Sequence, residues 1–319
     1  GGGQNTQFYS SLSYTKQDGI IQNQGLERFT GNANLTHTFK RLTVQVTSQF
    51  SKMIQKKTNE GTSYDGAVAN YAFFQSPSST PYNEDGSLNN GCGMFGVNPL
   101  YEFQHSSDRA TIIKAFNTVK ATYNIWDNLN LSEKISYDYM TNTNDVLWDR
   151  YSNNGGPGGV MQRIISKNEQ LNTQTQLTYN KAFGEHNIDA LLGFETEDNK
   201  YAYNYLSGQD YPGDLYEFTN AGSTSADSNI QSYRLTSFLG RVNYDFGGKY
   251  YLSASYRTDG SSRLARDNRW GSFWSVSGAW RFTHENFMES TKEVLTDGKL
   301  RLSYGVNGTQ PSVYYGYMN

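Results

Sequence analysis

The feature that most constrains the fold is an alternation of apolar and polar side chains with a period of two. Residues 42–47 read LTVQVT, residues 119–125 read VKATYNI, and residues 274–280 read WSVSGAW. Successive side chains of a β-strand point to opposite faces, so this pattern predicts strands with one apolar and one polar face.

The alternation predicts about eleven strands, and several exceed the usual five or six residues of a globular strand. Helix signals are nearly absent. The best is Ser290-Thr-Lys-Glu293, a capping-box pattern before Val294, with Gly298 as a stop. The expected strands lie near 6–16, 26–39, 42–56, 110–125, 129–150, 160–182, 186–205, 231–246, 250–259, 270–282 and 299–308.

Tight and long connections alternate along the chain. In an up-and-down meander, this alternation places the tight connections at one end of the strands and the long connections at the other. Short periplasmic turns and long extracellular loops are typical of an outer-membrane barrel. The segment 283–298 is the one long connection on the tight side. The tight connections are 40–41, 126–128, 183–185 and 247–249, and the other long ones are 17–25, 57–109, 151–159, 206–230 and 260–269.

Composition favours a membrane barrel over a soluble all-β protein. Only 36% of the 319 residues are hydrophobic although 15% are aromatic, which is a poor supply for one large core. The polar faces use Asn, Gln, Thr and Ser with few charges, as a water-filled lumen would. Aromatic residues near strand ends fit membrane girdles. A soluble sandwich or propeller, including a carbohydrate-binding one, remains the alternative.

No catalytic, metal or cofactor site is expected. Four separated histidines and the single Cys92 offer no ligand spacing, and nothing fixes two carboxylates, such as Asp65 and Asp85, at a working distance. The GGPGG sequence at 155–159 lacks the residues of a phosphate loop and is expected to be a flexible loop tip. With 27 basic against 30 acidic residues, nucleic-acid binding is not supported.

Aromatic residues in the long connections are candidates for ligand binding. Their ring faces, set among amide and hydroxyl groups, suit sugar rings. The alternative is that they pack the loops together. The candidates are Tyr64, Tyr71, Phe73, Phe74, Tyr82, Tyr211 and Tyr216.

A second group of candidates is the charged stretch DGSSRLARDNRWG at 259–271, with Arg257 just before it. By alternation Arg257 points into the lumen between lipid-facing Tyr256 and the loop. We expect a structural charge network at the barrel's outer rim rather than an active site. An anion-binding role, which only the charge of the stretch supports, is the alternative. The expected members of the network are Arg257, Asp259, Arg263, Arg266, Asp267 and Arg269.

Several segments resemble the SusC-like TonB-dependent outer-membrane transporters of Bacteroidetes. The strongest is FLGRVNYDFGGKYYLSASYRTDGSSRLARDNRWGSFWSVSGAWRF at 238–282, which departs from the family at Trp274, where proline is frequent. The others are TQFYSSLSYTKQDGIIQNQGLERFTGNANLTHTF (6–39), Asn98-Pro99-Leu100-Tyr101, HNIDALLGFE (186–195) and LTDGKLRLSYGVNGTQ (295–310).

The resemblance implies a multi-pass outer-membrane barrel of about 22 strands, of which this chain supplies about half. Residues 1–319 would form a partial barrel domain, and the plug, the TonB-contacting segment and the closing strands would lie outside it. The implied function is TonB-energised import of oligosaccharides or peptides under a SusD-like surface lipoprotein. A passive porin or an anchoring platform is the alternative.

Overall fold

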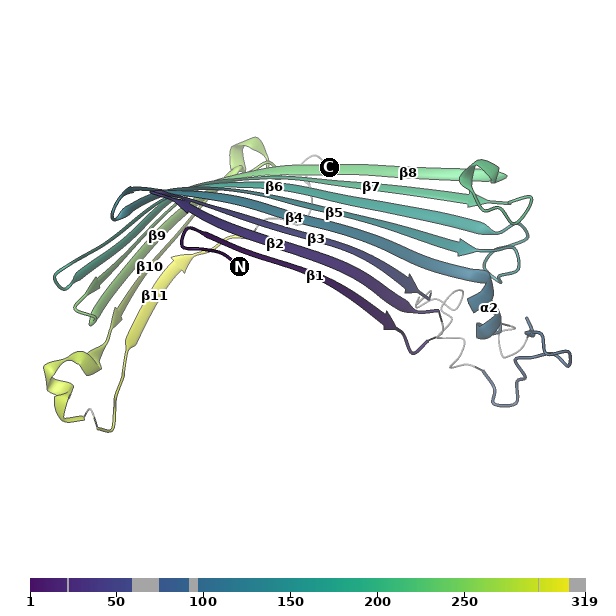
Figure 1. Ribbon diagram of the computed structural model, residues 1–319, viewed down its shortest axis with the longest axis horizontal. Coiled ribbons are helices and arrows are strands. Elements are labelled where there is room, and N and C mark those ends of the chain that lie inside the picture. The colour runs from purple at the N-terminus through teal and green to yellow at the C-terminus, as the bar shows by residue number, and fades with distance from the viewer. Residues whose placement is uncertain (22, 59–74, 92–96, 292, 310–319) are drawn as a thin grey trace.

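The computed structural model describes residues 1–21, 23–58, 75–91, 97–291 and 293–309 and shows one strongly curved antiparallel sheet (Figure 1). Its eleven strands pair in chain order from β1 to β11, as a meander requires. The strands are β1 Thr6–Asp18, β2 Gly25–Phe39, β3 Leu42–Lys57, β4 Ser106–Trp126, β5 Leu129–Trp148, β6 Val160–Phe183, β7 His186–Gln209, β8 Ser223–Phe246, β9 Tyr250–Ser261, β10 Trp270–Trp280 and β11 Leu300–Val306.

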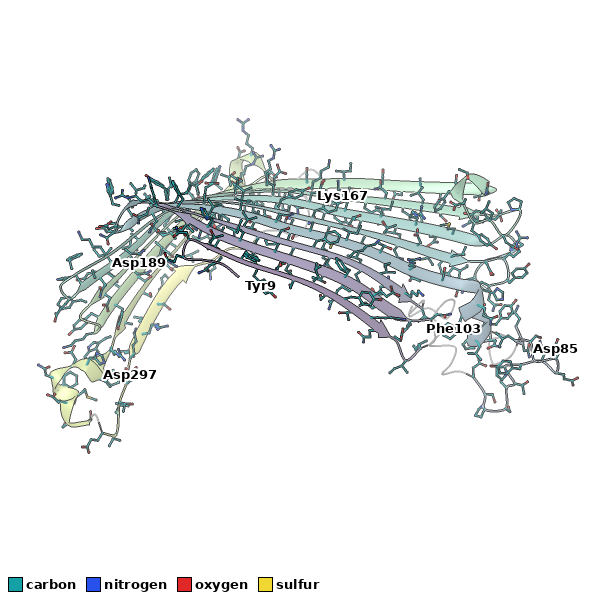
Figure 2. The ribbon with its side chains drawn as sticks, viewed as in Figure 1. Tyr9, Asp85, Phe103, Lys167, Asp189 and Asp297 are labelled. Atoms are coloured by element: carbon teal, nitrogen blue, oxygen red, sulfur yellow. The ribbon has the colours of Figure 1, made fainter. Side chains whose placement is uncertain are left out.

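The eleven predicted strands and the sorting of their connections are confirmed. At one end the turns are tight, and Lys40, Gly184 and Gly247 adopt positive φ there. Figure 2 shows Phe103 and Asp85 at the opposite, loop end, whereas Asp297 lies with the turns. The long link before β11 therefore belongs to the turn end.

The helices differ from the prediction. The capping-box pattern at 290–293 starts no α-helix. Instead, the 3-10 helix η4 covers Asn286–Thr291, and residue 292 lies outside the described part. Among the described residues, the α-helix is α2, Pro99–His105. Three further 3-10 helices are η1 Phe218–Asn220, η2 Arg266–Asn268 and η3 Phe282–His284.

The sheet turns its apolar side chains outward. Within the described residues, the buried hydrophobic side chains are Val97, Ala110 and Tyr211, which is far too few for a soluble domain of this size. Large apolar residues at alternate strand positions are exposed instead. They include Phe8, Leu12, Phe50, Val119, Leu131, Leu192, Val242, Tyr256 and Val276. This arrangement suits a wall whose outer face meets lipid.

Hydrogen-bonded rows run obliquely across the wall. The row that starts at Leu42, the first residue of β3, passes through Tyr123 and Leu192 and reaches Trp274, which lies six residues before the end of β10. This stagger is the shear that lets tilted strands close into a barrel.

The longest strands exceed the membrane. β6, β7 and β8 each have 24 residues, or about 80 Å at 3.3 Å per residue, against an apolar band about 25 Å tall. On the outer face of β7, the continuous apolar run ends at Phe194 and is followed by Thr196, Asp198 and Lys200. The loop-end parts of these strands therefore stand in water. No helix in the described residues is long and apolar enough to cross a membrane.

Candidate functional site

The loop end of the sheet is organised around α2. Asn98 caps this helix, since its Oδ1 accepts a hydrogen bond from the Leu100 N–H at 3.0 Å, and Pro99 follows at the first helical position. The amide of Asn98 also donates to the carbonyls of Pro81 and Asn89, each at 2.9 Å. One asparagine thus fixes both the helix start and the loop before it.

A buried carboxylate connects α2 to the β5–β6 loop. Glu102 is only 2% exposed. Its Oε2 accepts from Ser152 Oγ, and its Oε1 accepts from both the backbone N–H and the side-chain amide of Asn153, all at 2.8 Å. These bonds satisfy a charge that would be costly to bury alone.

An imidazole–carboxylate pair lies beside this contact. Nδ1 of His105 is 2.8 Å from Oδ2 of Asp149, and the His105 ring packs against Tyr101 with centroids 4.2 Å apart. The other oxygen of Asp149 accepts from the backbone N–H groups of Tyr151 and Ser152. The start of the loop is therefore held at several points.

The GGPGG sequence packs closely against its neighbours, unlike the flexible tip expected from sequence. A Cβ on Gly158 would stand 2.5 Å from Cα of Asp210, and one on Gly159 would stand 2.5 Å from Cε1 of Tyr216. Gly155 would place a Cβ 1.8 Å from the carbonyl oxygen of Asp149. Glycine is required here because other parts of the chain occupy the space of a side chain.

Arg150 joins the β5–β6 loop to the β7–β8 loop. Its backbone N–H donates to the Tyr216 hydroxyl at 3.0 Å, and its guanidinium donates to the Tyr211 carbonyl at 2.9 Å and pairs with Asp214 at 3.1 Å. Burial raises the pKa of the Tyr211 phenol. Three connections thus form one assembly, which we call the loop scaffold: α2, residues 149–159 and residues 210–222.

The predicted binding aromatics divide between three settings. Tyr211, 2% exposed, packs edge-to-face on Tyr216 with ring centroids 5.1 Å apart, so both rings support the loop scaffold. Tyr82 is 54% exposed and offers a free ring face. The remaining four candidates lie outside the described residues: Tyr64, Tyr71, Phe73 and Phe74.

The predicted rim charges divide between strand β9 and the β9–β10 connection. Arg257 donates to Asp259 at 2.7 Å, to Glu195 at 3.0 Å and to Ser237 Oγ at 3.0 Å, so its fork joins β7, β8 and β9 on the polar face. Such multiple charge-assisted bonds fix the relative position of strands.

The other rim residues lie in the β9–β10 connection. Arg263 stacks on the Tyr233 ring, with its guanidinium carbon 3.7 Å from the centroid. Arg266 and Asp267 are exposed in η2, and Arg269 is half-buried. Among the described residues these last three form no ion pair, so the structure does not join the six residues into one network.

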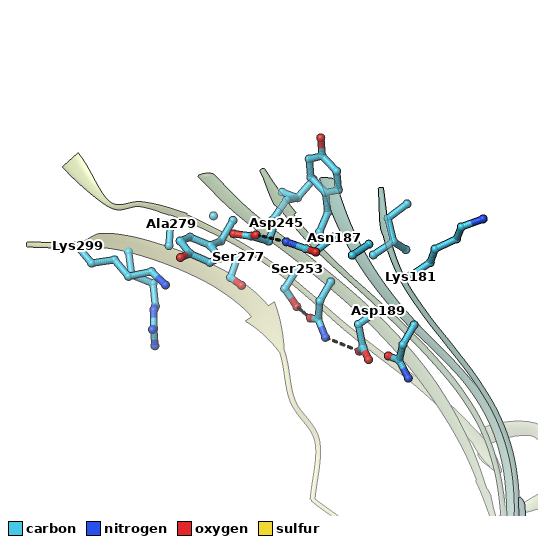
Figure 3. Close-up of a pocket in the computed structure, with 17 residues that line it drawn as sticks. Lys181, Asn187, Asp189, Asp245, Ser253, Ser277, Ala279 and Lys299 are labelled. Carbon is cyan, nitrogen blue, oxygen red and sulfur yellow. Dashed lines mark hydrogen bonds between the residues drawn. The ribbon is translucent and has the colours of Figure 1, made fainter. Parts of the chain in front are cut away.

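The polar face also carries an open pocket of about 610 Å³ near the turn end. Figure 3 shows Asn187 bonded to Asp245, with Lys299 on the other side of the pocket. Asn243 donates a hydrogen bond to Asp189 at 3.0 Å. The lining combines amides and carboxylates with the cations Lys181, Lys299 and Arg301. Within the described residues no cluster of three or more His, Cys, Asp or Glu is arranged to hold a metal.

Sequence reasoning did not find Glu102 or Arg150, because their partners are 50 to 66 residues away in the chain. The signal for α2 was present in Asn98-Pro99, an N-cap residue before a proline at the first helical position. In the sequence this pair was noted only as part of a family resemblance within the 57–109 connection.

Curated proteins similar to this chain are TonB-dependent receptors. The receptor SusC of Bacteroides thetaiotaomicron is 27% identical over 336 residues, covering 97% of this chain and 33% of SusC. Receptor P3 of Formosa agariphila is 28% identical over 325 residues, covering 98% of this chain and 32% of P3. The chain therefore spans about a third of the length of these relatives. No model of a known protein family matches it.

Solved structures show the same fold. The RagAB peptide importer in its closed-closed state superposes with a TM-score of 0.86 at 21% identity, over 98% of this chain and 36% of that one. The open form of the ferric-catecholate receptor Fiu from E. coli gives a TM-score of 0.59 at 13% identity, over 97% and 51%. The sheet is a section of the wall of such a barrel.

Proposed function

We propose that the protein containing this chain imports nutrients into the periplasm. The chain is similar over almost its whole length to SusC-like TonB-dependent receptors, and it forms a section of an outer-membrane β-barrel. The observation that carries the proposal is the match over 97% of the chain together with a sheet that is apolar outside and polar inside. The chain's part would be the wall, and no covalent chemistry is assigned to it.

TonB would energise this import, and a SusD-like lipoprotein would cover the loops. The names of the relatives support TonB dependence, and the likeness to the RagAB importer supports a two-protein assembly. The plug and the TonB-contacting segment belong, in this proposal, to other parts of the protein, since the relatives are about three times as long. The loop scaffold would present a firm surface to the lid.

The substrate class proposed is an oligosaccharide or a peptide. Tyr82 has a free ring face for stacking, and the candidates Tyr64, Tyr71, Phe73 and Phe74 belong to the same connection. Tyr211 and Tyr216 would act indirectly, by fixing the loops that surround the entrance. The Arg257–Asp259–Glu195 contacts would hold the wall below the loops in register.

Uptake by cells that express the full-length protein tests the function. Labelled oligosaccharide and peptide pools are supplied to cells with and without TonB, and uptake is compared with cells lacking the protein. Import of a defined pool that stops without TonB supports the proposal. Import that continues without TonB indicates a passive porin, and no import of either pool favours an anchoring platform.

A further inference from the structure

Three cations lie near one another on the outer face of the wall, just beyond the apolar band on the loop side. Lys52 and Lys56 lie on β3 and Arg109 lies on β4; we call them the cationic patch. On β3, the lipid-facing position before Lys52 is the exposed Phe50. Alternation therefore places the patch on the lipid side of the sheet, not in the lumen.

The register brings two of these cations directly together. Lys56 pairs with Arg109 across the β3–β4 ladder, and Lys52 pairs with apolar Ile113. Directly opposed residues of an antiparallel pair have Cβ atoms about 5 Å apart, and like charges in this position destabilise the sheet. An anion bound between the two side chains would remove that penalty.

Several outer-face charges on β5 to β8 are paired with one another. Lys167 bonds Glu169 at 2.9 Å, and Arg234 bonds Asp198 at 2.7 Å. Asp145, which lies directly across from Arg109, is held by Arg163.

None of the three patch residues forms an ion pair with a described residue. A second outward acid, Glu27, lies across from Ile54 and forms no ion pair with a described residue either. The three cations therefore have no ion-pair partner among the described residues.

The position of the patch identifies what those surroundings are. The loop end of an outer-membrane barrel faces the cell exterior, and the surface just above its apolar band meets lipid headgroups. Clustered Lys and Arg side chains at that level attract anionic headgroups, and the fork of an arginine suits phosphate oxygens. We propose that Lys52, Lys56 and Arg109 bind the phosphorylated headgroup of an outer-leaflet lipid.

This inference concerns anchoring of the barrel and is independent of what the barrel transports. A soluble phosphate would reach the patch only if lipid did not cover it. The proposed ligand is therefore a membrane lipid that contacts the protein at two places. Its acyl chains pack against Phe50, and its phosphate binds the cationic patch.

The test uses the full-length protein in detergent, with lipid binding followed by native mass spectrometry. The probes are bisphosphorylated lipid A and the same lipid without phosphates. The double substitution K56Q/R109Q removes two patch charges. The matched control is K120Q/K134Q, because Lys120 and Lys134 are also directly opposed but lie on the lumen side of β4 and β5.

We expect the wild-type protein to bind the phosphorylated lipid more tightly than the dephosphorylated one, and K56Q/R109Q to lose about tenfold or more of that preference. The control should retain it, and the charge-preserving K56R/R109K should restore it. Equal binding by wild type and K56Q/R109Q would overturn the proposal, as would an equal loss in the control. Displacement of the lipid by millimolar inorganic phosphate would also overturn it, because it indicates a site for small anions. If K56Q/R109Q does not fold, the single variant K52Q takes its place.

Discussion

Gly159 lies against the ring of Tyr216 so closely that a Cβ on the glycine would stand 2.5 Å from the tyrosine Cε1. The backbone of Gly159 also has a φ of +83°, a conformation that residues other than glycine rarely adopt. The hydroxyl of the same tyrosine accepts the backbone N–H of Arg150. One contact between two loops therefore depends on the absence of a single methyl group.

We predict that Gly159→Ala loosens the loop scaffold. The methyl group must displace the Tyr216 ring, and such overpacking costs about 1–3 kcal/mol in addition to about 1 kcal/mol for the left-handed backbone. Limited proteolysis of the full-length protein should then cleave residues 149–159 and 210–222 faster.

Gly156→Ala is the matched control for this substitution. It also has a positive φ, but no atom lies within 4 Å of its added Cβ. It should change cleavage much less than Gly159→Ala. Equal cleavage of the two variants would show that the ring contact is not limiting.

We predict that Glu102→Gln detaches α2 from the β5–β6 loop. The three donors around this carboxylate would meet an amide NH₂ in place of one oxygen, leaving a buried donor unsatisfied at a cost of about 1–3 kcal/mol. Hydrogen exchange at the Asn153 amide should accelerate. Exposed Glu84→Gln serves as the control and should leave that amide unchanged.

We predict opposite tolerance of arginine at two adjacent residues of β10. Val276, 45% exposed on the outer face, would place a charge against lipid, which costs about 2–4 kcal/mol near the bilayer midplane. Ser277 faces the polar pocket and has small neighbours, Ser253 and Ser303.

The readout is the amount of folded barrel in the outer membrane, judged by heat-modifiable migration on gels. Val276→Arg should reduce it strongly and Ser277→Arg only slightly. The reverse order would mean that the faces of the wall are assigned the wrong way round.

We predict that acid loosens the link before β11. Hydrogen bonds from Tyr250 at 2.6 Å and Trp280 at 3.0 Å lower the pKa of Glu285 from its ordinary value of 4.5. A carboxyl with a lowered folded-state pKa stabilises the fold above its ordinary pKa and ceases to do so as pH falls through the folded-state value. The contact should therefore be intact at neutral pH and weaken below about pH 4.5.

Glu285→Gln separates this effect from general acid damage. At pH 7 the variant should exchange amide hydrogens in residues 281–299 faster than the wild type, since it lacks the charge. The difference should shrink as the pH falls below 4.5, because the wild-type carboxyl becomes protonated. A difference that stays constant as the pH falls would assign the effect to something other than this carboxyl.

The strands could be predicted because their signal is local. A residue such as Val44 shows its face through its immediate neighbours, and lipid outside with water inside makes the alternation strict. The tight turns were equally readable, since Gly247-Gly248 and Lys40-Arg41 lie between two alternating runs.

The loop scaffold could not be predicted because its contacts join distant residues. Nothing near Glu102 in the sequence indicates that Asn153 will cover its carboxylate. The glycines of 155–159 were visible, but Tyr216, whose ring leaves no room for a side chain at Gly159, is more than 50 residues away. For the same reason Tyr211 could not be distinguished from a ring that is open to a ligand.

The scarcity of buried apolar side chains has a consequence for how substitutions act. In a soluble domain, sensitivity to substitution rises toward the centre, where truncated side chains leave cavities. Here lipid supplies the packing partner and flows into any space that a smaller side chain leaves. Truncation of Leu192 or Val242 should therefore be mild, whereas a single charge at either position should be severe. In this wall, therefore, the outer face tolerates smaller side chains but not charged ones.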